Sequence, residues 1–207
     1  MTEDLWETLI VIDVQNGFDD PSWGRRNNPQ AEENIGRLLD AWRGAGRPVI
    51  HVRHDSLHFG SPLRPDRPGN ALKEAVRPLP NEPVVGKSAH GAFVGTDLEE
   101  RLRRSGSPAV LLVGMTTNHC VSTTARMADD LGFAVRVVSD ATATFERRTP
   151  SGRLVPAEEM HELGLTELDG EFATIVDTDG VIAAMGVAGI AGPDHRRRGE
   201  VLLGRVE

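Results

Sequence analysis

Residues 109–132 read AVLLVGMTTNHCVSTTARMADDLG and carry three structural patterns in one stretch. The first five residues are all apolar, which is typical of a strand buried on both faces of a parallel sheet. A turn begins at Gly114, and a segment of helical spacing runs from about Cys120 to Leu131, where Gly132 ends it. The stretch therefore predicts a strand, a tight turn and a helix that starts at a cysteine.

The same alternation of short apolar runs and longer helical segments extends to both sides of this stretch. The runs predict strands at residues 8–12, 48–53, 83–86, 109–113, 134–138 and 172–176. Helical spacing predicts helices at residues 31–45, 96–105, 120–131, 156–163 and 178–185. Thr96 and Glu99 have the spacing of a capping box, and Thr178 or Asp179 can cap the last helix. This order predicts the α/β class, with a six-stranded, mainly parallel sheet covered on both faces.

Length and charge limit what the chain can be. With 207 residues it can bury one ordinary core, and we expect one domain over residues 1–188 and a solvated or chain-swapped tail at 189–207. A formal charge of −8 gives no general attraction to nucleic acid or anionic lipid. No apolar run approaches the ~20 residues of a membrane span, and the start of the chain lacks the pattern of a signal peptide. We therefore expect a soluble, cytoplasmic protein.

Three reactive side chains follow predicted strands. Asp13 comes after the first strand, Lys87 after the third, and Cys120 opens the helix that follows the fourth. In open parallel sheets, ligands bind beyond the carboxyl ends of the strands, where strand ends and helix N-termini meet. Each position is ordinary alone, but together they predict a catalytic site.

The chemistry of these residue types suits nucleophilic catalysis. A helix N-terminus and a nearby ammonium group such as that of Lys87 both favour the thiolate of Cys120, and Asp13 could accept and return a proton. The amides of the turn from Gly114 could stabilise an oxyanion. Structural roles remain open for each residue: an inert buried cysteine, a turn-capping aspartate, a solvated lysine and an ordinary βα loop.

Histidines near these positions give weaker signals. His119 adjoins Cys120, but neighbours on a helix do not face each other, so a dyad between them is not expected. His51, His54 and His58 with Asp55 could suggest a metal, yet strand alternation would send His51 and His54 to opposite faces. The proline-rich segment 54–69 is instead interpreted as a substrate-facing loop.

Five segments resemble the isochorismatase-like cysteine hydrolases. They are LIVIDVQNGF (9–18), SPLRP (61–65), VVGKSAHGAFVGTDLE (84–99), VGMTTNHCVSTTARMADDLGF (113–133) and SDATATF (139–145). The resemblance covers about residues 8–181 and implies a Rossmann-like three-layer α/β/α sandwich. It places Asp13, Lys87 and Cys120 on the family triad, and Thr116 and Cys120 on an oxyanion hole behind a cis Met115–Thr116 peptide. Homo-oligomers are usual in the family.

The resemblance also implies a class of activity. It implies a small-molecule substrate, because members hydrolyse amides and ureido or carbamoyl compounds through a thioester, or cleave the enol ether of isochorismate without the thiol. In the nicotinamidase branch an Asp-x-His pair binds metal, whereas this chain has Asp55-Ser56-Leu57, so we expect no metal and no cofactor. A C–N hydrolase is favoured; an Asp13-dependent ether hydrolase and a non-catalytic binding or redox-sensing protein are the alternatives. The residues expected to line the substrate pocket are Gln15, Phe18, Trp23, His54, Phe93, Thr117 and Asn118.

Overall fold

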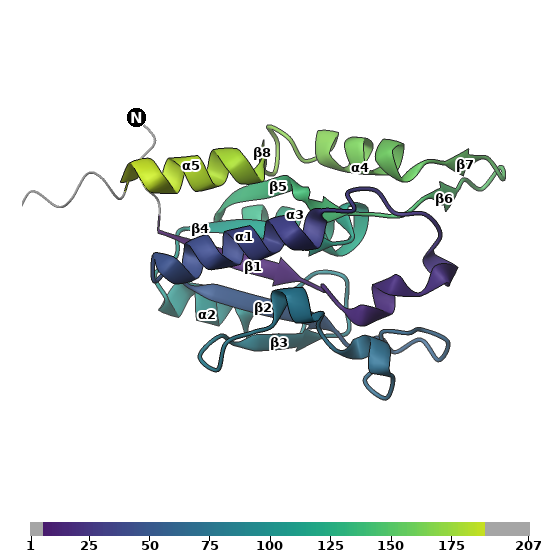
Figure 1. Cartoon of the computed structure of the whole chain (residues 1–207), viewed down its shortest axis with the longest axis horizontal. Coiled ribbons are helices and arrows are strands. Elements are labelled where there is room, and N and C mark those ends of the chain that lie inside the picture. Colours follow the sequence, from purple (N-terminus) through teal and green to yellow (C-terminus); the bar gives the residue numbers. More distant parts are fainter. Residues whose placement is uncertain (1–5, 189–207) are drawn as a thin grey trace, which may run out of the picture.

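The computed structural model describes residues 6–188, in which six parallel strands form the central sheet (Figure 1). Their spatial order is β3 (Val84–Lys87), β2 (Val49–His54), β1 (Glu7–Ile12), β4 (Ala109–Met115), β5 (Ala134–Ala143) and β8 (Thr174–Val176). Every neighbouring pair in this sheet is parallel. The chain therefore has the α/β fold and the six-stranded sheet that the alternation of patterns predicts.

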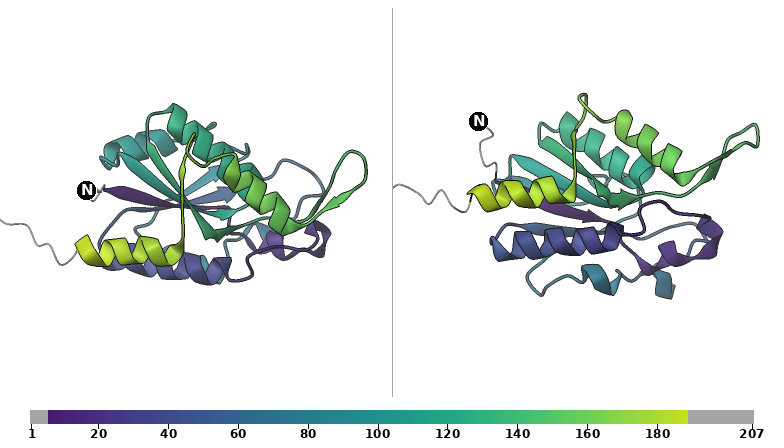
Figure 2. Two further views of the ribbon diagram at one scale, coloured as in Figure 1. Left: turned by 90° about the horizontal axis from the view of Figure 1, so that it is seen from above. Right: turned by 45° about the horizontal axis from the view of Figure 1, so that its top comes forward.

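Helices cover both faces of the sheet, which gives three layers (Figure 2). On one face lie α1 (Ala31–Gly44) and α5 (Thr178–Ala188), which contact each other. On the other lie α2 (Leu98–Arg104), α3 (Ser122–Asp130) and α4 (Ala157–Thr166). The two apolar cores follow from strand alternation, because Leu9 and Val11 pack under α1 while Ile10 packs toward α2 and α3.

The end of β4 lies unusually close to the end of β1. Gly114 pairs with Ile12 and has a φ of 116°, a conformation that L side chains rarely adopt. A Cβ on Gly114 would stand 2.0 Å from the carbonyl oxygen of Ile12. This position therefore requires glycine, and the close approach brings the turn after β4 next to the residue that follows β1.

Local details differ from the sequence expectations where another partner competes. Helix α2 begins at Leu98, and the Thr96 hydroxyl accepts from the Leu98 amide and donates to Ala92 O, so the expected capping box with Glu99 does not form. At α5 the Gly180 amide donates to the side chain of Asp177, which directly precedes the two expected caps, Thr178 and Asp179.

A small antiparallel hairpin of β6 (Arg147–Arg148) and β7 (Leu154–Val155) was not expected, because its strands are only two residues long. The tail predicted at 189–207 lies outside the described residues. None of the helices in residues 6–188 is long and apolar enough to cross a bilayer.

Candidate active site

A cavity of about 500 Å³ opens at the carboxyl ends of β1, β3 and β4. Asp13 directly follows β1, Lys87 is the last residue of β3, and Cys120 lies in a π-helical turn (Thr117–Val121) between β4 and α3. The residues that line the cavity are Asp13, Phe18, Ser22, Trp23, His54, Ser56, His58, Gly60, Ser61, Pro62, Leu63, His90, Thr116, His119 and Cys120. The parallel strands thus bring Asp13 and Cys120 to one cavity, and Lys87 lies directly behind it.

Asp13 is a completely buried carboxyl group with one oxygen in use. Its backbone has a φ of 54°, in the left-handed region that Asp tolerates better than most residues. Oδ2 accepts a hydrogen bond of 2.7 Å from Lys87 Nζ, whereas Oδ1 is buried with no hydrogen-bond partner among the described residues. Burial raises the pKa of Asp13 above its usual range, and the Lys87 ammonium opposes that rise. The free oxygen can therefore take a proton.

Lys87 is held in place by three acceptors. Its fully buried ammonium donates to Asp13 Oδ2, to His54 Nδ1 at 3.1 Å and to Ala89 O at 3.1 Å. The register of β2 and β3 pairs His54 with Lys87, which explains why the two side chains meet. With three donors and three acceptors the ammonium is saturated, so it fixes the Asp13 carboxylate in one orientation.

Cys120 is a buried thiol that reaches the cavity. Burial, and then the negative charge of Asp13, raise its pKa to about 12, and Lys87 opposes this only in part. The sequence predicts a thiolate favoured by the helix N-terminus; the thiol form is favoured instead, because burial and the charge of Asp13 both act against the thiolate. A carboxylate oxygen of Asp13 lies within 4.8 Å of Sγ. Attack by sulfur therefore requires that a base accept the thiol proton.

The turn after β4 borders the same cavity. The peptide bond between Met115 and Thr116 is cis, at the position that the family resemblance implied. Thr116 O accepts hydrogen bonds from the amides of His119 and Val121, which closes the turn. Thr116 and Cys120 both line the cavity.

Three of the seven residues expected in the pocket line the cavity, namely Phe18, Trp23 and His54. The two aromatic rings lie 5.1 Å apart and form an apolar wall. His54 is neutral at physiological pH, because burial and the Lys87 charge lower its pKa to about 4. The two rings offer a small ligand an apolar surface, and the His54 imidazole offers it a hydrogen bond.

The other four residues do not line the cavity. The Gln15 amide accepts from the His54 backbone amide and donates to the carbonyls of His54 and Asn70, so it ties loops together. The half-buried Phe93 ring lies 6.3 Å from that of Phe133 and packs against the core.

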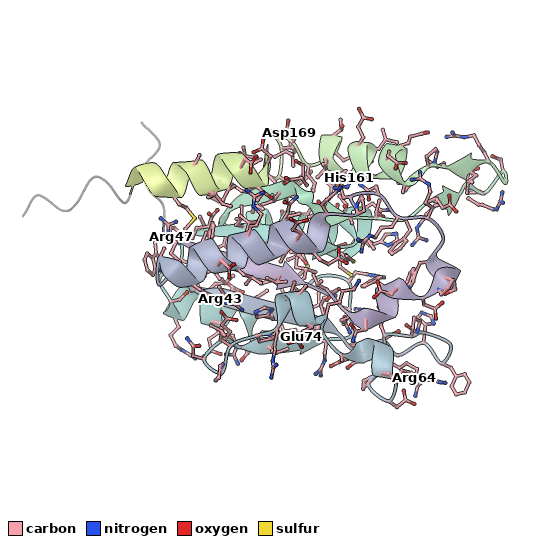
Figure 3. All side chains as sticks on the ribbon, viewed as in Figure 1. Arg43, Arg47, Arg64, Glu74, His161 and Asp169 are labelled. Atoms are coloured by element: carbon pink, nitrogen blue, oxygen red, sulfur yellow. The ribbon has the colours of Figure 1, made fainter. Side chains whose placement is uncertain are left out.

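Thr117 and Asn118 point toward the neighbouring elements instead. Thr117 bonds His161, which Figure 3 labels on α4, and Asn118 accepts from Thr144. Adjacency in sequence to Asp13, Lys87 or Cys120 does not place a side chain in the pocket.

Several cavity residues were not among those expected. Ser56, His58, Gly60, Ser61, Pro62 and Leu63 belong to the loop after β2, whose proline-rich composition indicated a substrate-facing role but not which side chains turn inward. His119 also lines the cavity, and burial and Arg147 lower its pKa to about 4. His90 lies with Nδ1 3.7 Å from Cys120 Sγ. No sequence signal beyond its place three residues after Lys87 pointed to it.

One group of side chains in the cavity has the residue types of a metal site. Ligand atoms of Asp13, His54 and Cys120 lie within 4.8 Å of one another. The Lys87 ammonium bonds two of these three residues, however, and its positive charge opposes a cation at the same place. Asp55 cannot help, because Arg53 and Asn70 already bond its carboxylate. The donor set does not fit a divalent cation while Lys87 occupies it.

The fold and site define a three-layer α/β protein with an aspartate, a lysine and a cysteine gathered at the carboxyl edge of its sheet. Residues 7–180 match the isochorismatase domain. The chain belongs to the isochorismatase family and is a hydrolase of that family.

Relatives with similar sequences and structures span most of the chain. It is 44% identical to the Bacillus subtilis isochorismatase family protein YrdC, covering 85% of this chain and 94% of that protein. It is 34% identical to Nicotinamidase 3 of Arabidopsis thaliana, covering 83% and 84%. An isochorismatase-family structure from Chromobacterium violaceum superposes with a TM-score of 0.85 at 43% identity, covering 90% and 96%.

Proposed function

We propose that this protein hydrolyses a C–N bond of a small amide or of a ureido or carbamoyl compound through a thioester on Cys120. The observation that carries the proposal is the buried Asp13–Lys87 pair, in which one carboxylate oxygen has no partner among the described residues and the carboxylate lies within 4.8 Å of a thiol that lines a cavity. A relative of this chain, Nicotinamidase 3, is named for an amide substrate.

The proposed first half-reaction forms the thioester. Asp13 Oδ1 accepts the thiol proton, Sγ bonds the carbonyl carbon, and the carbonyl π electrons move to oxygen. The amides of Thr116 and Cys120 are proposed to hold that oxyanion, and each such donor is worth about 3 kcal/mol in the transition state. The oxyanion then collapses, the C–N bond breaks, and the nitrogen leaves with the electron pair and with a proton donated by an acid that borders the cavity.

The proposed second half-reaction releases the acid. Water attacks the thioester carbon and gives one proton to the group that protonated the nitrogen, the C–S bond breaks, and sulfur regains the proton that Asp13 held. The cavity of about 500 Å³ limits the substrate to a small molecule, and Phe18 and Trp23 offer a face for a flat or apolar group.

The experiment is release of ammonia or amine from a panel of small amides, ureido compounds and nicotinamide. Cys120→Ala should abolish turnover, a loss on the order of 10⁴-fold or more, because no thioester can form. Arg104→Ala, an exposed residue at the far edge of the sheet, is the matched control and should retain full activity. Amide turnover that survives Cys120→Ala would contradict the thioester.

A second candidate is an enol-ether hydrolase that uses Asp13 as a general acid. The observation that favours it is the unpartnered oxygen of Asp13 at the cavity, which can bind a proton and pass it to an ether oxygen, and burial raises the pKa of this carboxyl group. Hydrolysis of isochorismate that survives Cys120→Ala but not Asp13→Asn would select this candidate over the thioester mechanism.

A further inference from the structure

His90 contacts the nucleophile from outside the Asp13, Lys87 and Cys120 group. Its Nδ1 lies 3.7 Å from Cys120 Sγ, within the range of a hydrogen bond to sulfur. The side chain is exposed and lines the cavity, whereas Asp13 is completely buried. Sulfur is therefore flanked by a buried carboxyl group and by an imidazole on the open cavity.

The segment that carries His90 is fixed on both sides. Lys87 Nζ donates to Ala89 O, and the Ala92 amide donates to the Thr124 hydroxyl on α3 at 3.1 Å. Gly91 packs so tightly against α3 that a Cβ there would stand 2.3 Å from Met127 Sδ. These contacts fix the backbone on both sides of His90, so the imidazole stays close to sulfur.

The proposed reaction needs a proton at the open side of the cavity. A C–N bond breaks readily only when the departing nitrogen is protonated, because an amide anion is a very poor leaving group. That nitrogen is bonded to the carbon that sulfur attacks, so a group touching Sγ can reach it. Asp13 and His90 both line the cavity, but Asp13 is buried and bonded to Lys87, whereas His90 is exposed.

We propose that His90 is a further catalytic residue, which protonates the leaving nitrogen. This rests on the proposed function and divides the proton transfers between two groups. Asp13 takes the thiol proton; as the C–N bond breaks, the nitrogen takes its electron pair and a proton from the His90 imidazolium. His90 is then neutral and accepts a proton from the water that attacks the thioester, and Asp13 returns its proton to sulfur. The sum is amide plus water to acid plus amine.

The test compares two leaving groups on one acyl group. His90→Asn is assayed with an amide or ureido compound that the wild type hydrolyses and with the corresponding p-nitrophenyl ester or carbamate. The variant should lose about 100-fold or more in kcat/KM for the C–N substrate, the usual contribution of a general acid. It should keep nearly the wild-type rate on the p-nitrophenyl substrate, because p-nitrophenolate leaves without a proton.

His58→Asn is the control, since His58 also lines the cavity but has no hydrogen bond to Cys120 among the described residues. It should leave the ratio of the two rates as in the wild type. Equal losses on both substrates in His90→Asn, or no loss on either, would overturn the role of His90 while leaving the thioester intact. If the wild type hydrolyses neither substrate, or if turnover survives Cys120→Ala, the proposed function is overturned, and the role of His90 with it.

Discussion

Two cavities of nearly equal size lie at opposite edges of the same sheet. The one at the carboxyl edge has a volume of about 500 Å³, and the one at the amino edge about 540 Å³. Figure 3 shows Arg43 and Arg47, which line the amino-edge cavity, on the side of the molecule opposite to Arg64 in the loop after β2. Volume alone therefore does not distinguish a reactive site from a structural hollow.

The two cavities differ in how their carboxyl groups are satisfied. At the amino edge, Glu82 accepts two hydrogen bonds of 2.8 Å from Arg43, one from the Leu79 amide and one from His51. Burial raises the pKa of Glu82, but these bonds outweigh it and hold the pKa at about 2. At the carboxyl edge, Asp13 keeps one unpartnered oxygen and a raised pKa. Incomplete pairing, more than size, indicates where a proton can be transferred.

The largest effect on stability is expected when Lys87 is replaced. Lys87→Met leaves the Asp13 carboxylate buried without its cation, and it should lower the free energy of unfolding at pH 7 by about 3–5 kcal/mol. Without the ammonium the folded pKa of Asp13 rises further above its unfolded value of 3.8. The variant should therefore come closest to the wild type below pH 3.8 and lose stability as the pH rises.

Urea unfolding at several pH values measures this loss. The double variant Asp13→Asn with Lys87→Met is the control, because a neutral amide next to an apolar chain should recover most of the stability. A deficit in Lys87→Met that does not change between pH 4 and pH 7 would contradict a buried, uncompensated carboxylate as its cause.

A smaller effect of opposite pH dependence is expected at the amino edge. Glu82→Gln removes an anion whose pKa is depressed from 4.5 to about 2, and it should cost about 2 kcal/mol at pH 7. The stability from a depressed pKa is present above 4.5 and is lost as the pH falls toward 2, so the variant and the wild type should converge there. Because Glu82 is far from the proposed chemistry, Glu82→Gln should leave kcat/KM unchanged. A changed kcat/KM would contradict the view that only the carboxyl edge takes part in catalysis.

The sequence predicts the deep part of the carboxyl-edge cavity better than its mouth. Asp13 follows a fully buried strand and Lys87 ends an edge strand, and apolar runs make both strand ends visible in the sequence. The mouth depends on how the loop after β2 folds back, and that is fixed by distant polar contacts such as those of Gln15 and Asn70. Such contacts join residues that no local pattern links.

The direction in which a side chain points is the second feature that the sequence does not predict. His90 and Phe93 are three residues apart in one irregular segment, yet the imidazole lines the cavity and the phenyl ring packs against the core. In a strand or helix, periodicity would indicate which face each side chain occupies. In this irregular segment, the direction of each side chain depends on packing against α3. The raised pKa of Cys120 was missed for a similar reason, because burial is not visible at a helix start.

The smallest expected effect is a rise in KM that distinguishes a residue of the cavity wall from a residue that packs against the core. Phe18 lines the cavity, with its ring 6.0 Å from that of Phe145, whereas Phe93 is half-buried and packs against the core outside the residues that line the cavity. Phe18→Leu and Phe93→Leu remove the same atoms and should each cost about 1 kcal/mol of stability in urea. In steady-state assays only Phe18→Leu should raise KM, because only that ring can contact the substrate. An equal rise of KM in both variants would mean that core packing, and not the aromatic wall, governs binding at this edge.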